Sequence, residues 1–289
     1  MSVEYESRKV IDRLKKSAEE TTGEGYATLT EAHQALKNGY GKSDTPTNPY
    51  VDTRMFTNLS GFFASNQHLS TLPYFDTSNV TKFTSVFQDS DKITEFPNLN
   101  FKKGTDFGYA FQGCQFTTAN LEINKPQFIN QAFQNCKKLE TVNIIIANAD
   151  IFTSLGGAFN GCTSLREVTF SGTPKVANFS QSFNGCTNLV TINGLDMSSM
   201  TSCNSTFSNC KALENLNIIN GIRIFNNSFS LGSCSLLTAE SLHNVVSLLF
   251  SANKSTRYQI TLPKGAIDKL SDEDKLHAEN ENIALVEAS

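Results

Sequence analysis

Residues 155–170 read LGGAFNGCTSLREVTF, and this sequence indicates a repeat architecture because it returns, with variations, along most of the chain. Its aromatic residue, Phe159, belongs to a series of eight phenylalanines separated by 24, 24, 22, 26, 24, 24 and 22 residues. The series is Phe63, Phe87, Phe111, Phe133, Phe159, Phe183, Phe207 and Phe229. A period in the twenties is typical of a solenoid, whose units are too small to bury their own apolar faces and must stack on their neighbours.

Each unit reads apolar-x3-Phe-x2-Cys-x2-Leu-x2-Val-x-Ile, with Leu, Phe, Ile or Cys in the first apolar position. The alternating Val and Ile positions predict a short strand with one buried face. The i, i+4 spacing of the first apolar residue and the phenylalanine predicts a helical or 3₁₀ turn before that strand. Stacking the units would align the strands into a long parallel sheet and pile the rings into an internal column. The third unit departs from the pattern, with Thr117 in the leucine position and an extra residue before Leu121, and this predicts a bulged strand.

The unit resembles the bacterial leucine-rich repeats of the BspA type, which read Ala-Phe, two residues, Cys, two residues, Leu, two residues, Val. The matching stretches are residues 132–142 and 158–168. Residues 75–87 and, more loosely, 195–207 resemble a sister repeat with the signature Phe-Asp-Thr-Ser-Asn-Val-Thr and then Met-Phe. The resemblance covers about residues 55 to 235 and implies an α/β solenoid, a right-handed stack of about eight units with short parallel strands.

The seven cysteines fall on the repeat rather than on a ligand or disulfide pattern. Six occupy the repeat cysteine position, with Cys234 displaced by two residues, and Cys203 replaces the apolar residue of its unit. Free cysteine is a common buried packing residue, and these spacings offer no C-x2-C metal set. We therefore expect reduced thiols and no metal or other cofactor. The predicted structural core comprises Phe111, Cys114, Phe133, Cys136, Phe159, Cys162, Phe183, Cys186, Phe207 and Cys210.

The chain divides into four predicted segments. Residues 1–42 are a helical N-terminal segment for capping or attachment, 43–54 a linker, 55–235 the solenoid, and 236–289 an α/β C-terminal cap. In the cap, Thr238 is expected to start a helix over residues 239–252, Pro263 to stop a strand over 258–262, and Ser271 to open a second helix. The narrow apolar stripe of the N-terminal helices predicts docking on another chain, on copies of itself, or on the first repeat.

No motif for catalysis is present. The four histidines lack ligand-like partners, and there is no glycine-rich phosphate loop, H-E-x-x-H or G-x-S-x-G sequence. The net charge of −4 and the balanced charges of the repeats argue against nucleic acid as a partner. No apolar run reaches the ~20 residues needed to span a membrane. The charged first 16 residues predict no secretory signal.

The residues that flank the buried valine of each strand are predicted to form a binding surface. They make two columns of polar side chains, spaced ~4.8 Å apart like neighbouring strands, which suit a glycan or a protein partner. One column is Thr141, Glu167, Thr191 and Asn215, and the other is Asn143, Thr169, Asn193 and Asn217. An Asn ladder that only stabilises the stack is the alternative.

Two functions are compatible with these features. Residues 26–41 and the order of the C-terminal cap resemble segments of phage and prophage tail-associated proteins. This favours a non-enzymatic virion protein, a phage tail or tail-fibre component assembled in the bacterial cytoplasm. Its N-terminal helices would attach to other tail proteins, and its repeats would bind a host glycan or protein; a homo-oligomer is compatible with this arrangement. The alternative is a host-encoded BspA-like adhesion or protein-interaction module.

Overall fold

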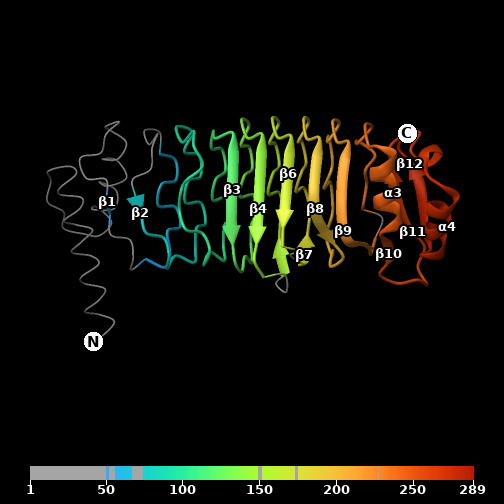
Figure 1. The fold of residues 1–289 in the computed structure, drawn as a ribbon, viewed down its shortest axis with the longest axis horizontal. Helices are drawn as coiled ribbons and strands as arrows, with labels where there is room; N and C mark the ends of the chain where they lie inside the picture. Colours follow the sequence, from blue (N-terminus) through green and yellow to red (C-terminus); the bar gives the residue numbers. More distant parts are fainter. Residues whose placement is uncertain (1–49, 52–55, 67–73, 149–151, 173–174, 227) are drawn as a thin grey trace.

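The computed structural model describes residues 50–51, 56–66, 74–148, 152–172, 175–226 and 228–289. These residues form a row of stacked coils with a parallel sheet running along one side and a cap with two helices at the C-terminal end (Figure 1). The predicted N-terminal helices of residues 1–42 lie outside the described residues. The number of complete units and the handedness of the stack remain predictions.

Six strands make the main sheet, and every neighbouring pair is parallel, as predicted. In spatial order they are β3 (Thr118–Ile123), β4 (Thr141–Ile146), β6 (Glu167–Ser171), β8 (Thr191–Met197), β9 (Asn215–Ile224) and β10 (Leu249–Ser251). In β3, β4 and β6 successive residues alternate between the buried and the outward face, so that β4 buries Val142, Ile144 and Ile146. The period of two in the sequence therefore fixes which face of each strand packs against the core.

A second line of parallel pairing follows another side of the stack. It consists of the two-stranded sheet of β5 (Phe152–Ser154) and β7 (Lys175–Asn178), continued in both directions by single bridges such as Asn58↔Lys82 and Asn178↔Ser202. Nearer the N-terminus, β1 (Tyr50–Val51) pairs with β2 (Tyr74–Phe75). β1 lies within residues 43–54, the expected linker, and its pairing keeps the 24-residue step of the repeat.

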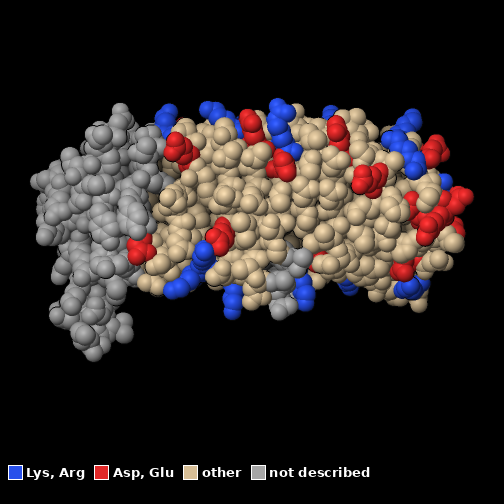
Figure 2. All heavy atoms as spheres, viewed as in Figure 1, with Lys and Arg blue, Asp and Glu red and all other residues tan. Residues whose placement is uncertain are grey.

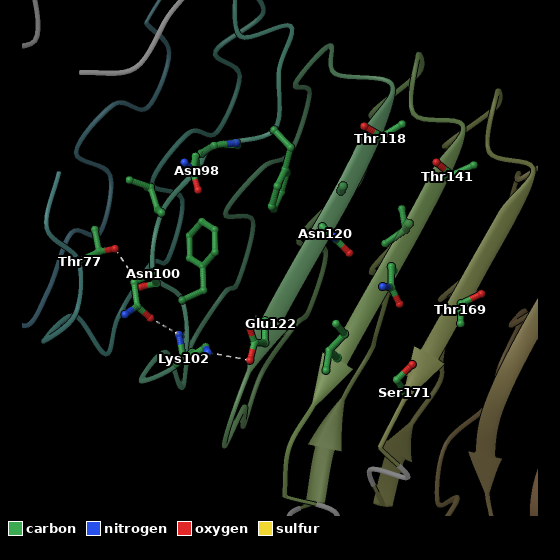
Figure 3. A pocket seen from close by; sticks show the side chains of 18 of the residues that line it. Thr77, Asn98, Asn100, Lys102, Thr118, Asn120, Glu122, Thr141, Thr169 and Ser171 are labelled. Atoms are coloured by element: carbon green, nitrogen blue, oxygen red, sulfur yellow. Dashed lines mark hydrogen bonds and ion pairs between the residues drawn. The ribbon is translucent and has the colours of Figure 1, made fainter. Parts of the chain in front are cut away.

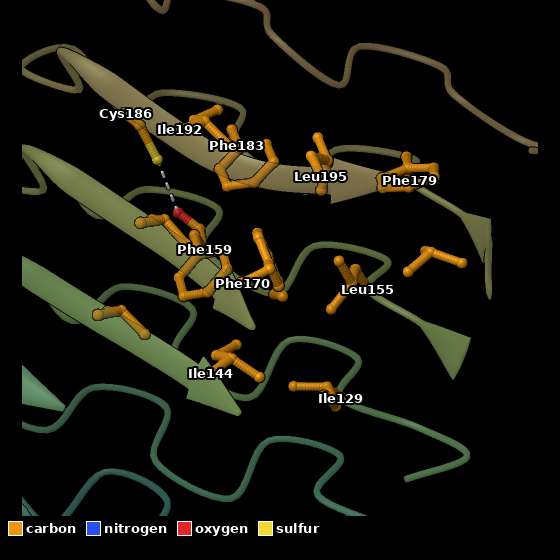
Figure 4. Packing of buried hydrophobic residues seen from close by; sticks show 14 of the residues in the cluster. Ile129, Ile144, Leu155, Phe159, Phe170, Phe179, Phe183, Cys186, Ile192 and Leu195 are labelled. Atoms are coloured by element: carbon orange, nitrogen blue, oxygen red, sulfur yellow. Dashed lines mark hydrogen bonds between the residues drawn. The ribbon is translucent and has the colours of Figure 1, made fainter. Parts of the chain in front are cut away.

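The phenylalanine series forms a continuous internal stack. All eight rings are buried, and six successive pairs from Phe63 to Phe207 are stacked with centroids 5.2 to 6.0 Å apart. Figure 4 shows Phe159 and Phe183 in this stack, beside the apolar residues of the strands. The last pair, Phe207 and Phe229, meets edge to face at 6.2 Å, where the regular stack passes into the cap. Burial of these rings contributes a large part of the free energy that holds neighbouring coils together.

The segment before each strand is a run of turns, so the predicted helical or 3₁₀ turn is wrong. The N–H of Phe133 donates to the carbonyl of Ala158 in the next coil at 2.8 Å, whereas the N–H of Cys136 donates back to Phe133 at 3.1 Å. This alternation requires left-handed residues on both sides of the ring, Gln131 (φ 55°) and Asn135 (φ 58°). Backbone bonding between coils thus replaces the bonding within a helix.

The sequence records this geometry in one column of the repeat. Two residues after the phenylalanine, most units carry Gly, Asn or Asp, the types that adopt the left-handed conformation most readily. They are Asp89, Gly113, Asn135, Gly161, Gly185 and Asn209, all with positive φ.

The cysteines are buried and free, as predicted, and they also form hydrogen bonds that burial alone did not imply. In five consecutive units the thiol donates to the carbonyl of the phenylalanine one coil earlier, at 2.9 to 3.3 Å. Figure 4 shows one of these bonds, from Cys186 to Phe159. Ser90 occupies the same position in an earlier unit and donates to Phe63. The position therefore selects a small side chain with a donor.

The third unit does not bulge, contrary to the prediction. β3 pairs with β4 over all six residues without a shift of register. Phe116, which is buried one residue before the exposed Thr117, fills the core at this level. Register shifts occur instead in β8, between Asn193 and Leu195 and between Asp196 and Met197.

The C-terminal cap closes the apolar end of the stack with α3 (Ala239–Ser247), β11 (Tyr258–Leu262), a 3₁₀ turn (Ile267–Lys269), α4 (Asp272–Asn280) and β12 (Ile283–Glu287). Thr238 caps α3 and Ser271 caps α4, both as predicted. The first helix is shorter than the predicted 239–252, because residues 249–251 leave it to become β10 and pair with β9. The sheet thus gains an additional strand from the cap.

Ionisation of the buried thiols should make the stack sensitive to alkaline pH. Burial raises the pKa of Cys162 to about 12 and that of Cys203 to about 11. Thiols of an unfolded chain ionise near pH ~8.5, so stability present below that pH is lost as the pH rises toward 11–12. Each thiol should contribute a slope of up to about 1.4 kcal/mol per pH unit.

Urea unfolding of the parent and of Cys162→Ala between pH 8 and ~10.5 measures this effect. We expect the stability gap between the two proteins to narrow as the pH rises. A gap that stays constant over this range would contradict a protonated, buried thiol at Cys162.

Substitution of Gly194, at the register shift of β8, should lower the stability of the protein by more than the positive φ of this residue explains. It has φ 74°, and a Cβ at this position would lie 2.3 Å from the carbonyl oxygen of Phe170. Gly265 has φ 73° with open space around the same atom and provides the matched control. We expect Gly265→Ala to cost ~1 kcal/mol from the left-handed conformation alone. Gly194→Ala should cost about 1–3 kcal/mol more because of the clash, as measured by urea unfolding.

Candidate binding surface on the parallel sheet

The two predicted polar columns lie on the outward face of the main sheet in the predicted register. Thr141 pairs with Glu167, Glu167 with Thr191, and Thr191 with Asn215. The second column pairs Asn143 with Thr169, Thr169 with Asn193, and Asn193 with Asn217. All eight side chains are exposed or half-buried, so the strands bring the predicted site residues together on one face.

β3 extends both columns by one unit, which the sequence analysis missed. Thr118 pairs with Thr141, and Asn120 pairs with Asn143. The irregular spacing of the third unit concealed these two residues. The alternation of polar and apolar residues over 118–123 was the signal that could have found them.

Hydrogen bonds between neighbouring coils order part of this surface. The amide of Asn217 donates to Asn193 at 2.7 Å, and the amide of Asn193 donates to Thr169 at 3.4 Å. In the other column, Asn215 donates to Thr191 at 3.4 Å. The Asn ladder considered as the alternative therefore exists in these units, and it holds the polar groups in place for any ligand that meets them.

The ladder is interrupted between Thr169 and Asn143. The hydroxyl of Thr169 donates to the carboxylate of Glu167 at 3.4 Å, on its own strand. The side-chain oxygen of Asn143 is buried and has no hydrogen-bond partner within the described part of the chain. A donor from the next coil, such as Asn217 supplies to Asn193, is missing here.

A hollow opens on the sheet face beside this interruption. Its volume is about 1250 Å³, and it extends from residues 76–78 across residues 96–102 to the outward residues of β3, β4 and β6. Figure 3 shows Asn98, Asn100 and Lys102 along one side of it and Thr118, Asn120 and Glu122 on β3 along the other. Four of the predicted binding residues line it: Thr141, Asn143, Glu167 and Thr169.

Specific contacts hold the wall formed by residues 96–102. The hydroxyl of Thr77 donates to the carbonyl of Asn100 at 2.9 Å, and the side chain of Asn100 accepts from the N–H of Lys102 at 3.0 Å. Lys102 in turn forms an ion pair with Glu122 on β3 at 2.9 Å, which bridges one end of the hollow (Figure 3). Beneath the wall, the half-buried ring of Phe96 contacts Phe111 and Phe116 at centroid distances of 5.1 and 5.2 Å.

One group of side chains outside the sheet contains the residue types of a hydrolytic triad but not its connectivity. Asp274 of α4 accepts from Ser271 at 2.8 Å and is 2.7 Å from Nδ1 of His243 on α3. The carboxylate stands between the serine and the histidine, whereas a nucleophilic triad needs the histidine next to the serine. Burial opposes ionisation, but the bonds from Ser271 and His243 outweigh it and hold the pKa of Asp274 below its ordinary value. The group therefore joins the two cap helices.

Charge on the visible surface is sparse and mixed in sign over the coils, with acidic residues gathered at the C-terminal end (Figure 2). Among the described residues no cluster of His, Cys, Asp or Glu could hold a metal ion. Within the same residues, no helix is long and apolar enough to cross a bilayer.

The repeat, its cysteine position and the parallel sheet are the features by which the chain can be classified. Residues 84–193 and 157–269 match the BspA type leucine-rich repeat region, in six copies. The chain belongs to this family. No curated protein and no solved structure matches the chain. BspA-type leucine-rich repeats are generally non-enzymatic interaction modules.

Completing the ladder at its interruption should stabilise the sheet. In Thr169→Asn, the new amide can donate to the unpaired oxygen of Asn143, as Asn217 does to Asn193. A double-mutant cycle with Asn143→Ala separates this bond from the strand propensity of asparagine. We expect Thr169→Asn to raise the free energy of unfolding by ~1 kcal/mol more in the parent than in the Asn143→Ala background, measured by urea unfolding. Equal effects in both backgrounds would contradict the proposed bond.

Proposed function

We propose that this protein is a non-enzymatic recognition protein that binds its partner through the outward face of the main sheet. The observation that carries the proposal is the combination of two aligned polar columns with a large hollow on the same face. A solenoid supports such a surface well, because each coil is fixed to the next by backbone bonds and by the ring stack. The partner we expect is a glycan or a protein on a host surface.

The setting we propose for this recognition is a virion, in which the chain is a tail or tail-fibre component. The proposal is supported by the resemblance of residues 26–41 and of the C-terminal cap order to segments of phage tail-associated proteins. In it, residues 1–42 attach to other tail proteins and the repeats face the host. A host-encoded adhesion or protein-interaction module is the second candidate, supported by the family itself.

Antibody labelling distinguishes these two settings. Gold-labelled antibody against the chain should decorate the tails of particles released by the bacterium that carries the gene. Label found on the bacterial envelope, with unlabelled particles, would favour the host-encoded module instead.

Arginine side chains introduced on the sheet face should weaken binding of the partner without unfolding the chain. Thr141→Arg combined with Asn217→Arg places long side chains at two exposed positions of the columns. Gln127→Arg is the control, because Gln127 is also exposed but lies next to the bridge of Phe128 with Ser154, in the second line of pairing. We expect the double variant to reduce adsorption of labelled protein to host cells by ~tenfold or more. Adsorption of the control should match the parent, and an unaffected double variant would place recognition elsewhere.

A further inference from the structure

The outer edge of β3 lacks the backbone pairing that joins the strands of the main sheet. β3 ends that sheet on its N-terminal side, and its outer edge faces residues 93–102. Among the described residues, two backbone hydrogen bonds cross this gap. The N–H of Gln115 donates to Ile93 at 3.2 Å, and the N–H of Asn124 donates to Lys102 at 3.0 Å. Between these two points, β3 forms no backbone bond to residues 94–101.

The register identifies which backbone groups are left open. The carbonyls of Thr117 and Ile123 accept from residues at the two ends of β4. The backbone N–H and C=O groups of odd-numbered residues of β3 therefore point toward β4. The backbone groups of even-numbered residues point away from β4, as the bond from the N–H of Asn124 to the carbonyl of Lys102 shows. The N–H and C=O groups of Thr118, Asn120 and Glu122 therefore face the gap, at the two-residue spacing of a strand edge.

The segment opposite does not supply the missing pairing. Pro97 has no N–H to donate, and the N–H of Leu99 turns back to the carbonyl of Pro97 at 2.9 Å. The ion pair of Lys102 with Glu122 and the bond from Thr77 to Asn100 hold this segment in its non-strand conformation. An open strand edge of this kind is a template for an added strand.

The hollow lies directly along this edge, since both residues 96–102 and residues of β3 line it. Its volume of about 1250 Å³ exceeds the ~300–1,000 Å³ of a typical small-molecule pocket. Three lining side chains are acidic, Asp76, Glu122 and Glu167, against one basic residue, Lys102. The lining is therefore suited to a neutral or basic occupant of polymeric length.

We propose that the hollow binds an extended peptide segment of a partner protein, which adds as a strand to the outer edge of β3. Main-chain hydrogen bonds to Thr118, Asn120 and Glu122 provide the affinity, and the acidic lining selects segments with Lys or Arg over those with Asp or Glu. The inference rests on the proposed recognition function and narrows the partner to a protein with an accessible linear segment.

The test uses the full chain and a displayed library of random linear peptides. Peptides recovered on the parent are measured by calorimetry against Asn120→Pro and, as the matched control, Asn120→Ser. The N–H of Asn120 points away from β4, so proline removes a donor from the open edge without removing a bond within the sheet. We expect Asn120→Pro to weaken binding by about tenfold or more, and Asn120→Ser to stay within about twofold of the parent.

A second measurement uses only the parent protein, so it applies even if the proline variant unfolds. Single N-methylation along a recovered peptide should weaken binding at every second residue, where the peptide N–H points to β3, and should be tolerated between these positions. A library that yields no binder, affinity unaffected by the proline in a folded variant, or an N-methyl profile without a two-residue period would each overturn the proposal.

These results can be separated from a failure of the recognition function itself. Binding to an immobilised oligosaccharide panel that survives Asn120→Pro, with no peptide binder, would overturn the peptide inference and leave recognition by the sheet face intact. If Thr141→Arg with Asn217→Arg leaves adsorption unchanged, the recognition function fails whatever the library yields.

Discussion

Each coil of this protein is stable only in contact with its neighbours. A single coil of about 24 residues exposes an apolar edge that only a neighbouring coil can cover. Three kinds of contact act at each step: the stacked phenylalanine rings, the backbone bonds of the turns and strands, and the thiol bonds to the carbonyl of the preceding phenylalanine. Because all three have the same repeat, an irregular unit affects the sheet, the turns and the core together.

An irregular coil explains where the face of the main sheet becomes concave. In the coils from β4 to β9 the strands pair closely, and amides bond across the outward face. Pro97 and the turn that follows it take one coil out of this pattern, which opens the hollow and leaves the edge of β3 unpaired. Regular coils thus provide rigidity, while one departure from regularity provides a concave surface with unused hydrogen-bonding groups.

The seven cysteines of the chain are suited to packing rather than to nucleophilic attack. Its cysteines have raised pKa values because they are buried, so the thiolate needed for nucleophilic attack is disfavoured. The cluster of His243, Asp274 and Ser271 serves to join two helices of the cap. The groups accessible on the sheet face are hydroxyls, amides, the carboxylates of Glu122 and Glu167, and the open backbone edge of β3, all of which can form hydrogen bonds.

Most of the regular architecture could be predicted from the order of the amino acids: the repeat, the buried phenylalanine and cysteine columns, the parallel sheet, the two helix caps and the alignment of the polar columns. The repeat, the columns and the sheet follow from the period of the chain and the alternation along each strand, and each cap follows from the residues at the start of its helix. Four features became apparent only in the folded chain: turns replace the expected helix, the third unit keeps its register, α3 ends early to give β10, and a hollow opens beside β3. Each depends on which partner the neighbouring coil offers to a backbone group, and that partner lies some 24 residues away in the chain.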